Sequence, residues 1–235
     1  PSLNNDIVGA MHFTETGHVA NPYSVSHAFE TYLRKSGATI LKEEVTDIKY
    51  TDDDVTVYSG NRETSADLTI IAAGAFSKKL ASQCNIKAPL ETERGYHIHM
   101  ADIQADFTMP IASYERKIIM TPMSDGLRAT GIVEFGGLNM PPRNKNFDTI
   151  RHHVAGLVPD FDTQNASTWM GFRPSLPDHL PAIGFTDPQK RIMCAYGHQH
   201  LGLTLAGVTG KLVNKLVTGE APDIDLSHFD PNRFS

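Results

Sequence analysis

The sequence predicts a mixed fold in which α/β segments at both ends of the chain enclose a mainly antiparallel β-sheet. Three observations support this class. One helix is followed by several short strands within residues 1–88. Short strand-like stretches separated by turn signals fill residues 89–180, and a strand, a glycine-containing loop and a helix follow over residues 181–235. We therefore divide the chain into these three segments.

The first helix is predicted from the signals at its two ends. Asn21 and Pro22 are typical of a helix cap and of the first helical position. Lys35-Ser36-Gly37 ends the helix with a cation and a glycine. The apolar residues predicted to share its packing face are Val25, Ala28, Phe29, Tyr32 and Leu33.

Strand signals follow this helix. Alternating residues on either side of Asp52-Asp53-Asp54 predict two strands joined by a turn. A short apolar strand then runs into Ala73-Gly74-Ala75, where small residues would let a cofactor pass or would pack tightly in the core. The predicted strands cover residues 38–41, 45–50, 55–59 and 68–72.

The middle segment contains a predicted hairpin and one helix. Residues 117–120 and 127–133 flank the turn signal Ser124-Asp125-Gly126, which is typical of two antiparallel strands. A helix is expected over residues 146–157.

The last segment is predicted to be a strand, a loop and a helix. The strand covers residues 191–196 and the helix covers residues 203–217, with Gly219 ending it. We expect the tail over residues 221–235 to lie on the surface. The helix predicted over residues 203–217 would pack through Ala206, Gly210, Val213 and Val217. The order of elements fits a nucleotide-type domain interrupted by a substrate-binding sheet.

Composition limits the classes of function. The 235 residues carry a formal net charge of -6 without a basic block, so we expect no nucleic-acid partner. Cys84 and Cys194 form no CxxC, which argues against a zinc ribbon and a disulfide framework. The 11 histidines include His-x-His pairs, but no third ligand stands near them, so we predict no metal site. No apolar run reaches the ~20 residues of a membrane helix.

Two segments have the chemistry of ligand contacts. The glycine loop and helix start at residues 197–204 present free backbone N–H groups and a partial positive charge, which suits an electron-rich or anionic group. Such a unit is also a common structural connector. Arg173 stands between Gly171-Phe172 and Pro174, where its guanidinium would pair with a carboxylate. A surface arginine or a structural ion pair is the alternative.

Motifs along the chain resemble the D-amino-acid oxidase-like family of FAD-dependent oxidoreductases. The bacterial D-amino-acid dehydrogenases are the most similar branch. The matching stretches occur in the family's order and extend over nearly the whole chain. They are Ile71-Ala72-Ala73-Gly74-Ala75-Phe76-Ser77, Arg94-Gly95-Tyr96, Gly171-Phe172-Arg173-Pro174, Pro177-Asp178, Pro181-Ala182-Ile183-Gly184, residues 197–204 and residues 219–234.

The resemblance implies a partial FAD/NAD(P)-binding domain, residues 1–88 and 181–235, interrupted by a substrate-binding antiparallel sheet domain, residues 89–180. The family opens with a strand and G-x-G-x-x-G, and this chain contains no such motif. The chain begins at Pro1 rather than at a methionine, so we expect it to be the later part of a longer protein.

The resemblance also assigns roles to residues. Arg173 would hold the substrate carboxylate, His200 would face the substrate, and Tyr96 and Arg94 would line the pocket. Val45 would lie against the adenine through its backbone, and residues 198–204 would line the flavin ring. The implied FAD contacts are Val45, Ala73, Gly74, Gly171, Gly197, His198, Gln199, Leu201, Gly202, Leu203 and Thr204.

The implied reaction is oxidation of the CH–NH bond of D-amino acids or related imino acids to a keto acid and ammonia, by hydride transfer to the flavin. Electrons would pass to a quinone or to oxygen, at a cytoplasmic location or at the periphery of the inner membrane. Three alternatives stay open. One is a glycine- or sarcosine-oxidase-like amine oxidase, and another is a hydroxyproline- or opine-type oxidoreductase. The third is a cofactor-free fragment that needs an N-terminal segment or a second subunit.

Overall fold

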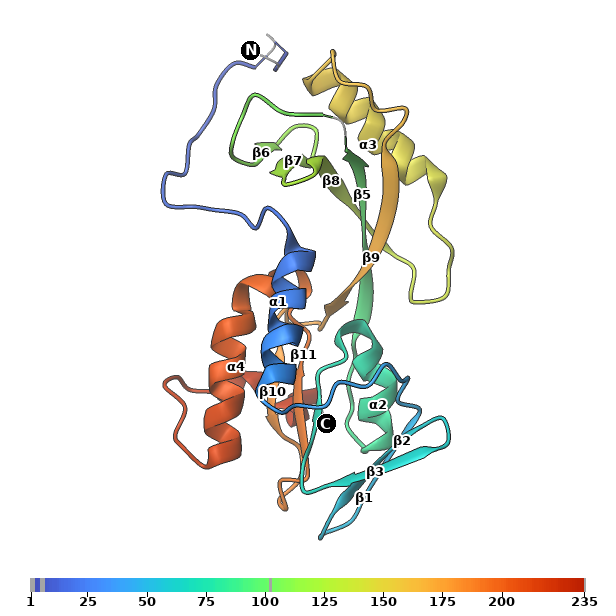
Figure 1. The fold of residues 1–235 in the computed structure, drawn as a ribbon, viewed down its shortest axis with the longest axis vertical. Coiled ribbons are helices and arrows are strands. Elements are labelled where there is room, and N and C mark those ends of the chain that lie inside the picture. The colour runs from blue at the N-terminus through green and yellow to red at the C-terminus, as the bar shows by residue number, and fades with distance from the viewer. Residues whose placement is uncertain (1–2, 5–6, 102, 235) are drawn as a thin grey trace. The chain divides into compact units, whose positions relative to one another are not determined.

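The computed structural model describes residues 3–4, 7–101 and 103–234 (Figure 1). The predicted first segment begins at Pro1 and the predicted last segment ends at Ser235, and both of these residues lie outside the described residues. The chain forms two compact units, each discontinuous in sequence. Unit 1 comprises Pro1–Leu41, Arg94–Glu134 and Met140–Gly171, and unit 2 comprises Lys42–Glu93, Phe135–Asn139 and Phe172–Ser235. The three-segment division at residues 88 and 180 stays a prediction.

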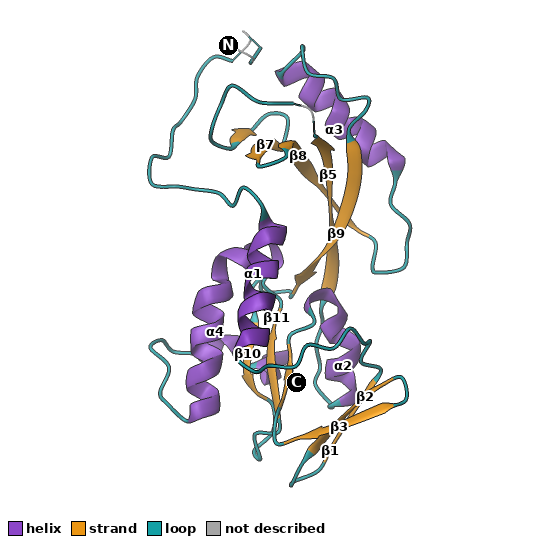
Figure 2. Cartoon of the chain, viewed as in Figure 1, coloured by secondary structure: helices purple, strands orange, loops and turns teal. Residues whose placement is uncertain are grey.

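The predicted fold class is confirmed, because helices combine with mainly antiparallel sheets (Figure 2). Unit 1 is built on a five-stranded sheet of order β6-β7-β8-β5-β9. Strands β5 and β9 also extend into the sequence of unit 2. The strands of this sheet are β5 (Glu91–Met100), β6 (Ile111–Ser113), β7 (Ile118–Met123), β8 (Gly126–Phe135) and β9 (Ser167–Ser175).

Helix α3 (Asn144–Leu157) covers one face of the unit 1 sheet, at the position predicted for a helix. Its buried residues Phe147, Ile150 and Val154 pack against alternate residues of β5, β7 and β8. The predicted hairpin is confirmed, since β7 and β8 pair antiparallel with Met123 opposite Gly126. Gly126 has φ +135, and a Cβ there would collide with the backbone of Met100 and Ala101. Only glycine therefore fits this turn.

Helix α1 (Pro22–Lys35) begins and ends where its signals predict. The Asn21 side chain accepts a hydrogen bond from the Ser24 backbone N–H at 3.0 Å, and Gly37 follows the helix with φ +92. The predicted packing face is wrong, because no residue of α1 is buried. Phe29 and Tyr32 are 62% and 68% exposed. End signals depend on the local backbone, whereas burial depends on distant partners.

Unit 2 contains two small sheets. Strands β1 (Asp47–Tyr50), β2 (Val55–Ser59) and β3 (Arg62–Ala66) form an antiparallel meander. In the second sheet, β11 (Ile192–Tyr196) pairs antiparallel with β10 (Ala182–Phe185) and parallel with β4 (Thr69–Ile71). The helices are α2 (Ser77–Gln83) and α4 (Gly202–Thr218). A core around Ile71, Ile192 and Cys194 joins the two sheets.

Several expectations for unit 2 are wrong in detail. Residues 38–41, which precede it, form no strand, although Thr39 and Ile40 have strand propensity. Strand β3 and helix α2 were not predicted, since the residues of β3 are mostly polar and all exposed, and α2 has only seven residues. The packing face predicted for α4 is exposed apart from Val213. The face turned to the core instead carries Leu205, Thr209, Leu212 and Leu216.

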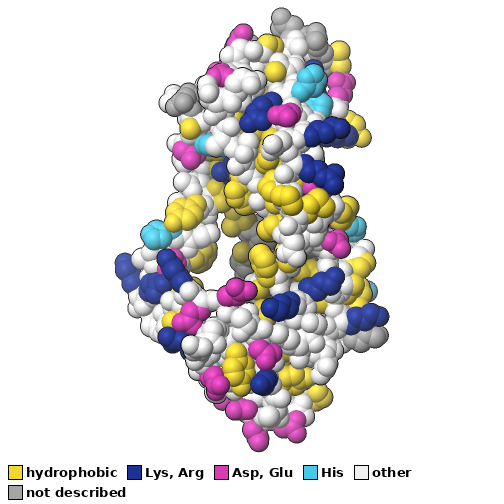
Figure 3. All heavy atoms as spheres, turned by 90° about the vertical axis from the view of Figure 1, so that its right-hand side faces the viewer, with side chains coloured by type: hydrophobic (Ala, Val, Ile, Leu, Met, Phe, Trp, Pro, Cys, Tyr) yellow, Lys and Arg dark blue, Asp and Glu magenta, His cyan; other side chains and the backbone are white. Residues whose placement is uncertain are grey.

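The surface carries both charge signs. Lys and Arg side chains are interspersed with Asp and Glu on the face shown in Figure 3. Among the described residues, no helix has the length and hydropathy to cross a membrane.

Candidate functional site

In unit 2, the predicted site residues Arg173 and His200 both interact with one carboxylate, that of Glu93. The Ser175 hydroxyl donates a hydrogen bond of 2.7 Å to Glu93 Oε1. His200 Nε2 lies 3.3 Å from Glu93 Oε2, with the Glu93 side chain 10% exposed and the His200 side chain 49% exposed. Two adjacent strands, β5 and β9, thus supply Glu93, Arg173 and Ser175, and the turn after β11 supplies His200.

Arg173 has an unused hydrogen-bond donor. Its Nη1 is buried and has no partner among the described residues. Burial lowers the pKa of the guanidinium, while the charge of Glu93 raises it. A buried cationic donor without an acceptor is costly, so this group favours the approach of an anion.

Glu93 is a functional candidate that the sequence reasoning missed. It is one of only a few charged side chains that are buried in the described part of the chain. The sequence offered one signal, which is that Glu93 directly precedes Arg94-Gly95-Tyr96. A carboxylate in a buried strand needs hydrogen-bond donors, so its position there indicates partners. Those donors, Ser175 and His200, lie 82 and more than 100 positions away, so sequence alone does not identify them.

The predicted flavin loop lies between β11 and α4. Gly197 has φ +91, and a Cβ there would come within 2.8 Å of the Leu176 side chain. Gln199 contacts His179 Nδ1, and Leu201, Leu203 and Thr204 are exposed. His198 Nε2 lies 2.9 Å from Thr209 Oγ1, and burial lowers the pKa of His198. A neutral imidazole therefore anchors the loop to its own helix.

Two glycines of unit 2 leave open space beside the backbone. A Cβ on Gly74, which has φ +55, would meet nothing within 4 Å, and a Cβ on Gly202 would meet only His198 Cβ at 3.8 Å. Gly74 follows Ala73 at the end of β4, and Gly202 is the first residue of α4. Val45 packs against the core of the same unit. These positions fit the close approach of a flat cofactor.

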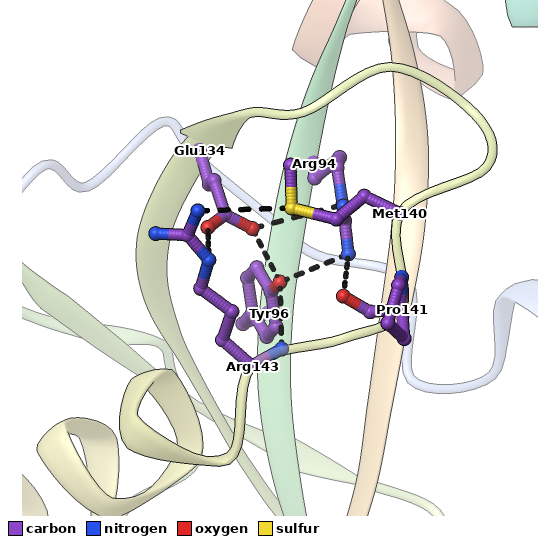
Figure 4. A network of polar contacts seen from close by, with 6 residues as sticks. All are labelled: Arg94, Tyr96, Glu134, Met140, Pro141 and Arg143. Carbon is purple, nitrogen blue, oxygen red and sulfur yellow. Dashed lines mark hydrogen bonds and ion pairs between the residues drawn. The ribbon is translucent and has the colours of Figure 1, made fainter.

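The other predicted pocket residues, Arg94 and Tyr96, are fully buried in unit 1. Both belong to a network of polar contacts (Figure 4). The Tyr96 hydroxyl donates to Glu134 Oε2 at 2.6 Å, and Arg94 Nη2 donates to the Pro141 carbonyl at 2.9 Å. Arg143 Nε lies 2.9 Å from Glu134 Oε1. This network joins strands β5 and β8 to the segment before α3. It gives Arg94 and Tyr96 a structural task, and their substrate contact stays a prediction.

Gly171 also lies in unit 1, on β9. A Cβ there would overlap the indole ring of Trp169. The glycine is therefore needed for the ring to lie flat along the strand, and its predicted cofactor contact is not tested by this packing.

Comparison with known proteins identifies the family. Residues 1–216 match the family described as FAD dependent oxidoreductase. A D-amino-acid oxidase of Bradyrhizobium diazoefficiens is 35% identical over 94% of this chain and 53% of its own length. A D-amino acid dehydrogenase of Vibrio atlanticus is 30% identical over 76% of this chain and 43% of its own length. The chain thus spans about half the length of these curated relatives.

Solved structures show the same fold. Glycine oxidase from Geobacillus kaustophilus aligns with a TM-score of 0.79 at 22% identity, over 89% of this chain and 57% of its own. L-proline dehydrogenase from P. horikoshii aligns with a TM-score of 0.78 at 19% identity, over 91% and 59%. The predicted family and its cofactor are confirmed: the chain belongs to the family of FAD-dependent oxidoreductases.

Proposed function

We propose that this chain supplies substrate and flavin contacts to an enzyme that oxidises the CH–NH bond of D-amino acids or related imino acids. The observation that carries the proposal is the buried, unpartnered Nη1 of Arg173 beside Glu93. The names of the relatives support it, since they are a D-amino-acid oxidase and D-amino acid dehydrogenases.

Arg173 is proposed to bind the substrate carboxylate. A guanidinium presents paired donors that match the two oxygens of a carboxylate, so it fixes the orientation of the Cα–H bond as well as the position of the acid. The charge of Glu93 raises the pKa of the Arg173 guanidinium and so favours its charged form. The same Glu93 carboxylate also holds the His200 ring, whose Nε2 lies 3.3 Å from Oε2. Glu93 and His200 are therefore proposed to limit how far Arg173 and the substrate can rotate.

When bound, FAD would supply the acceptor for the hydride that leaves Cα. The backbone at Ala73, Gly74 and Gly202 is proposed to hold the cofactor, because it is open enough for a flat ring to approach. The partial positive charge at the start of α4 favours an electron-rich ring edge. The imino acid product then hydrolyses to a keto acid and ammonia. An amine that arrives neutral needs no dedicated base, so we assign none.

The electron acceptor, quinone or oxygen, belongs to the proposal as an external partner. Cytoplasmic or peripheral inner-membrane location likewise stays a proposal. Purification of the chain with added FAD tests the first requirement, since retained flavin gives visible absorption bands. A chain that retains none would favour the alternative that it needs a further segment or subunit.

The substitution Arg173→Ala tests the carboxylate contact. In a flavin-containing preparation we expect KM for D-amino acids to rise on the order of 100-fold, because truncating one partner of a buried charge pair costs about 2–5 kcal/mol. Arg62→Ala, at an exposed ion pair with Glu43, is the matched control and should leave KM unchanged. An unchanged KM for Arg173→Ala contradicts the assignment. A preparation that turns over glycine or sarcosine but no D-amino acid favours the amine-oxidase alternative.

A further inference from the structure

In unit 2, the C-terminal tail holds an arginine against the turn that follows β9. Arg233 Nε donates to Asp178 Oδ2 at 2.7 Å, and Arg233 Nη2 donates to Asp178 Oδ1 at 3.1 Å. The same Nη2 donates to the Leu180 carbonyl at 2.8 Å. The Leu180 N–H in turn donates to Asp178 Oδ1 at 3.1 Å. One guanidinium therefore bonds to the residues on both sides of His179 and fixes the backbone there.

This ion pair is partly buried, and the tail that carries it has other attachments. The side chains of Arg233 and Asp178 are 14% and 33% exposed, and the hydrogen bond from Arg233 lowers the pKa of Asp178. Pro231 is buried beside Gly184 of β10, where a Cβ would come within 3.3 Å of Pro231 Cδ. Phe234 packs against the core of the unit. The tail thus has contacts that do not depend on the Arg233 side chain.

His179 connects this ion pair to the predicted flavin loop, residues 197–202. The Gln199 side-chain amide contacts His179 Nδ1. His179 has φ +63 and Gln199 has φ +50, so both adopt the left-handed backbone that residues other than glycine rarely take. Such conformations persist only where the surrounding structure enforces them. The bonds of Arg233 enforce the conformation of His179, and the contact with His179 restrains Gln199.

The turn after β9 touches the loop at a second point. Leu176 begins this turn, since its carbonyl accepts a hydrogen bond of 3.0 Å from the His179 N–H. A Cβ on Gly197 would come within 2.8 Å of Leu176 Cδ1, so the turn and the loop are in close contact there. His198, between the two points, is bound to Thr209 of α4 instead. The loop is therefore held by α4 on one side and by the turn after β9 on the other.

We propose that Arg233 is a positioning residue for the flavin loop, which it reaches through His179 and Gln199. This inference rests on the proposed function, because the loop matters for the reaction only where it faces the flavin. Loss of the guanidinium removes the bonds on both sides of His179. The contact with Gln199 then loosens, and the loop spends less time in the single conformation that presents its backbone to the cofactor.

Hydrogen exchange of the whole chain without FAD tests this positioning. The Leu201 N–H donates to the His198 carbonyl at 2.9 Å inside the loop, so its exchange rate reports on loop opening. We expect Arg233→Met, which keeps the length of the side chain and removes its donors, to speed this exchange about tenfold. An unchanged rate overturns the proposal. If Arg233→Met fails to fold, Asp178→Asn replaces it with the same expected result.

The matched control is Arg191→Met. Arg191 donates to two backbone carbonyls, those of Asp52 and Asp67, beside the other end of β11. Its replacement removes a comparable set of bonds from the same unit and should leave the exchange of Leu201 unchanged. Equal acceleration by Arg191→Met and Arg233→Met would show a general loosening of unit 2 and overturns the proposal.

A double substitution tests the route through Gln199. Gln199→Leu removes the polar contact with His179 and should speed the exchange of Leu201 by itself. Because both changes interrupt one chain of contacts, Arg233→Met should add little when Gln199 is already leucine. Fully additive effects would mean that Arg233 acts on the loop by another route, and they overturn the proposal.

Titration with FAD separates this inference from the proposed function. Quenching of flavin fluorescence should give a Kd about tenfold higher for Arg233→Met than for the unaltered chain and Arg191→Met, because a smaller fraction of the loop is ready to bind. A loosened loop with unchanged FAD affinity overturns the positioning role. If the unaltered chain and every variant fail to bind FAD, the proposed function is wrong, and the exchange rates alone decide whether Arg233 positions the loop.

Discussion

At the scale of residues, few charged side chains are buried in the described part of the chain, and two carboxylates that are almost buried each have two partners. Glu134 lies between Arg94, whose side chain is fully buried, and Arg143, which is 61% exposed. Glu93 lies between Ser175 and His200. Buried ion pairs add little net stability, but the loss of one partner is costly because the other charge stays buried. The two carboxylates are therefore the side chains whose removal should have the largest effects.

Glu134→Gln should destabilise unit 1. The substitution keeps the shape and removes the charge that faces the fully buried Arg94 guanidinium. We expect the free energy of unfolding in urea to fall by about 3–5 kcal/mol. Asp223→Asn is the control, because Asp223, whose side chain is 49% exposed, pairs with Lys211 and Lys215 at the surface, and it should change little. Equal effects of the two substitutions would show that Arg94 does not need its carboxylate.

Acid should weaken unit 1 through His97. Burial lowers its pKa in the folded chain to about 4 from 6.5, so the unfolded chain takes up the proton first. The stabilising contribution is complete above pH 6.5 and is lost as the pH falls toward 4. His97→Gln should flatten the fall in unfolding free energy over this range. Half-buried His198 and His153, whose pKa values are also lowered, still make the unfolding free energy of the variant fall with pH. A pH slope identical to that of the unaltered chain would contradict the assignment to His97.

At the scale of elements, sequence signals located structure well where the cause is local. The caps of α1, the turn of the β7–β8 hairpin and the glycine after α4 all depend on neighbouring residues, and all were predicted. The packing faces of α1 and α4 were predicted wrongly, because apolar periodicity shows a possible face and not the element that covers it. The same limit explains why Arg173 and His200 could be named from motifs, whereas Glu93, their common partner, could not.

Replacing glycine by alanine should have opposite effects on stability at two positions of helix α4 and its end. Gly219 ends the helix at φ +77, where an alanine Cβ meets no atom but strains the backbone. Gly207 lies inside the helix with equally free space. We expect Gly219→Ala to lower and Gly207→Ala to raise the thermal stability of unit 2, each by about 0.5–1 kcal/mol. Thermal unfolding followed by circular dichroism measures both, and two changes of the same sign would refute the conformational argument.

At the scale of the whole molecule, apolar surface is unevenly distributed. Tyr23, Phe29 and Tyr32 of α1 are 79%, 62% and 68% exposed, although a helix of this kind normally buries its aromatic side. Exposed apolar patches favour association between molecules. The fold class and the family could be predicted from sequence texture and motifs, whereas this exposed surface became known only from the coordinates.

We therefore expect the 235-residue chain to self-associate as its concentration rises. The double substitution of Phe29 and Tyr32 to serine should shift sedimentation velocity profiles toward the monomer. Ile224→Ser, at an exposed apolar residue outside α1, is the control and should leave the profiles unchanged. A concentration-independent monomer in the unaltered chain would refute the expectation.

Glu93 and Arg94 are consecutive in β5, yet one belongs to unit 2 and the other to unit 1. Side chains alternate along a strand, so inserting or deleting one residue between them would turn every later residue of β5 to the opposite face. Tyr96 would leave its core and His97 would enter it. Length variation among descendants of this chain should consequently be tolerated in its loops and absent from this junction.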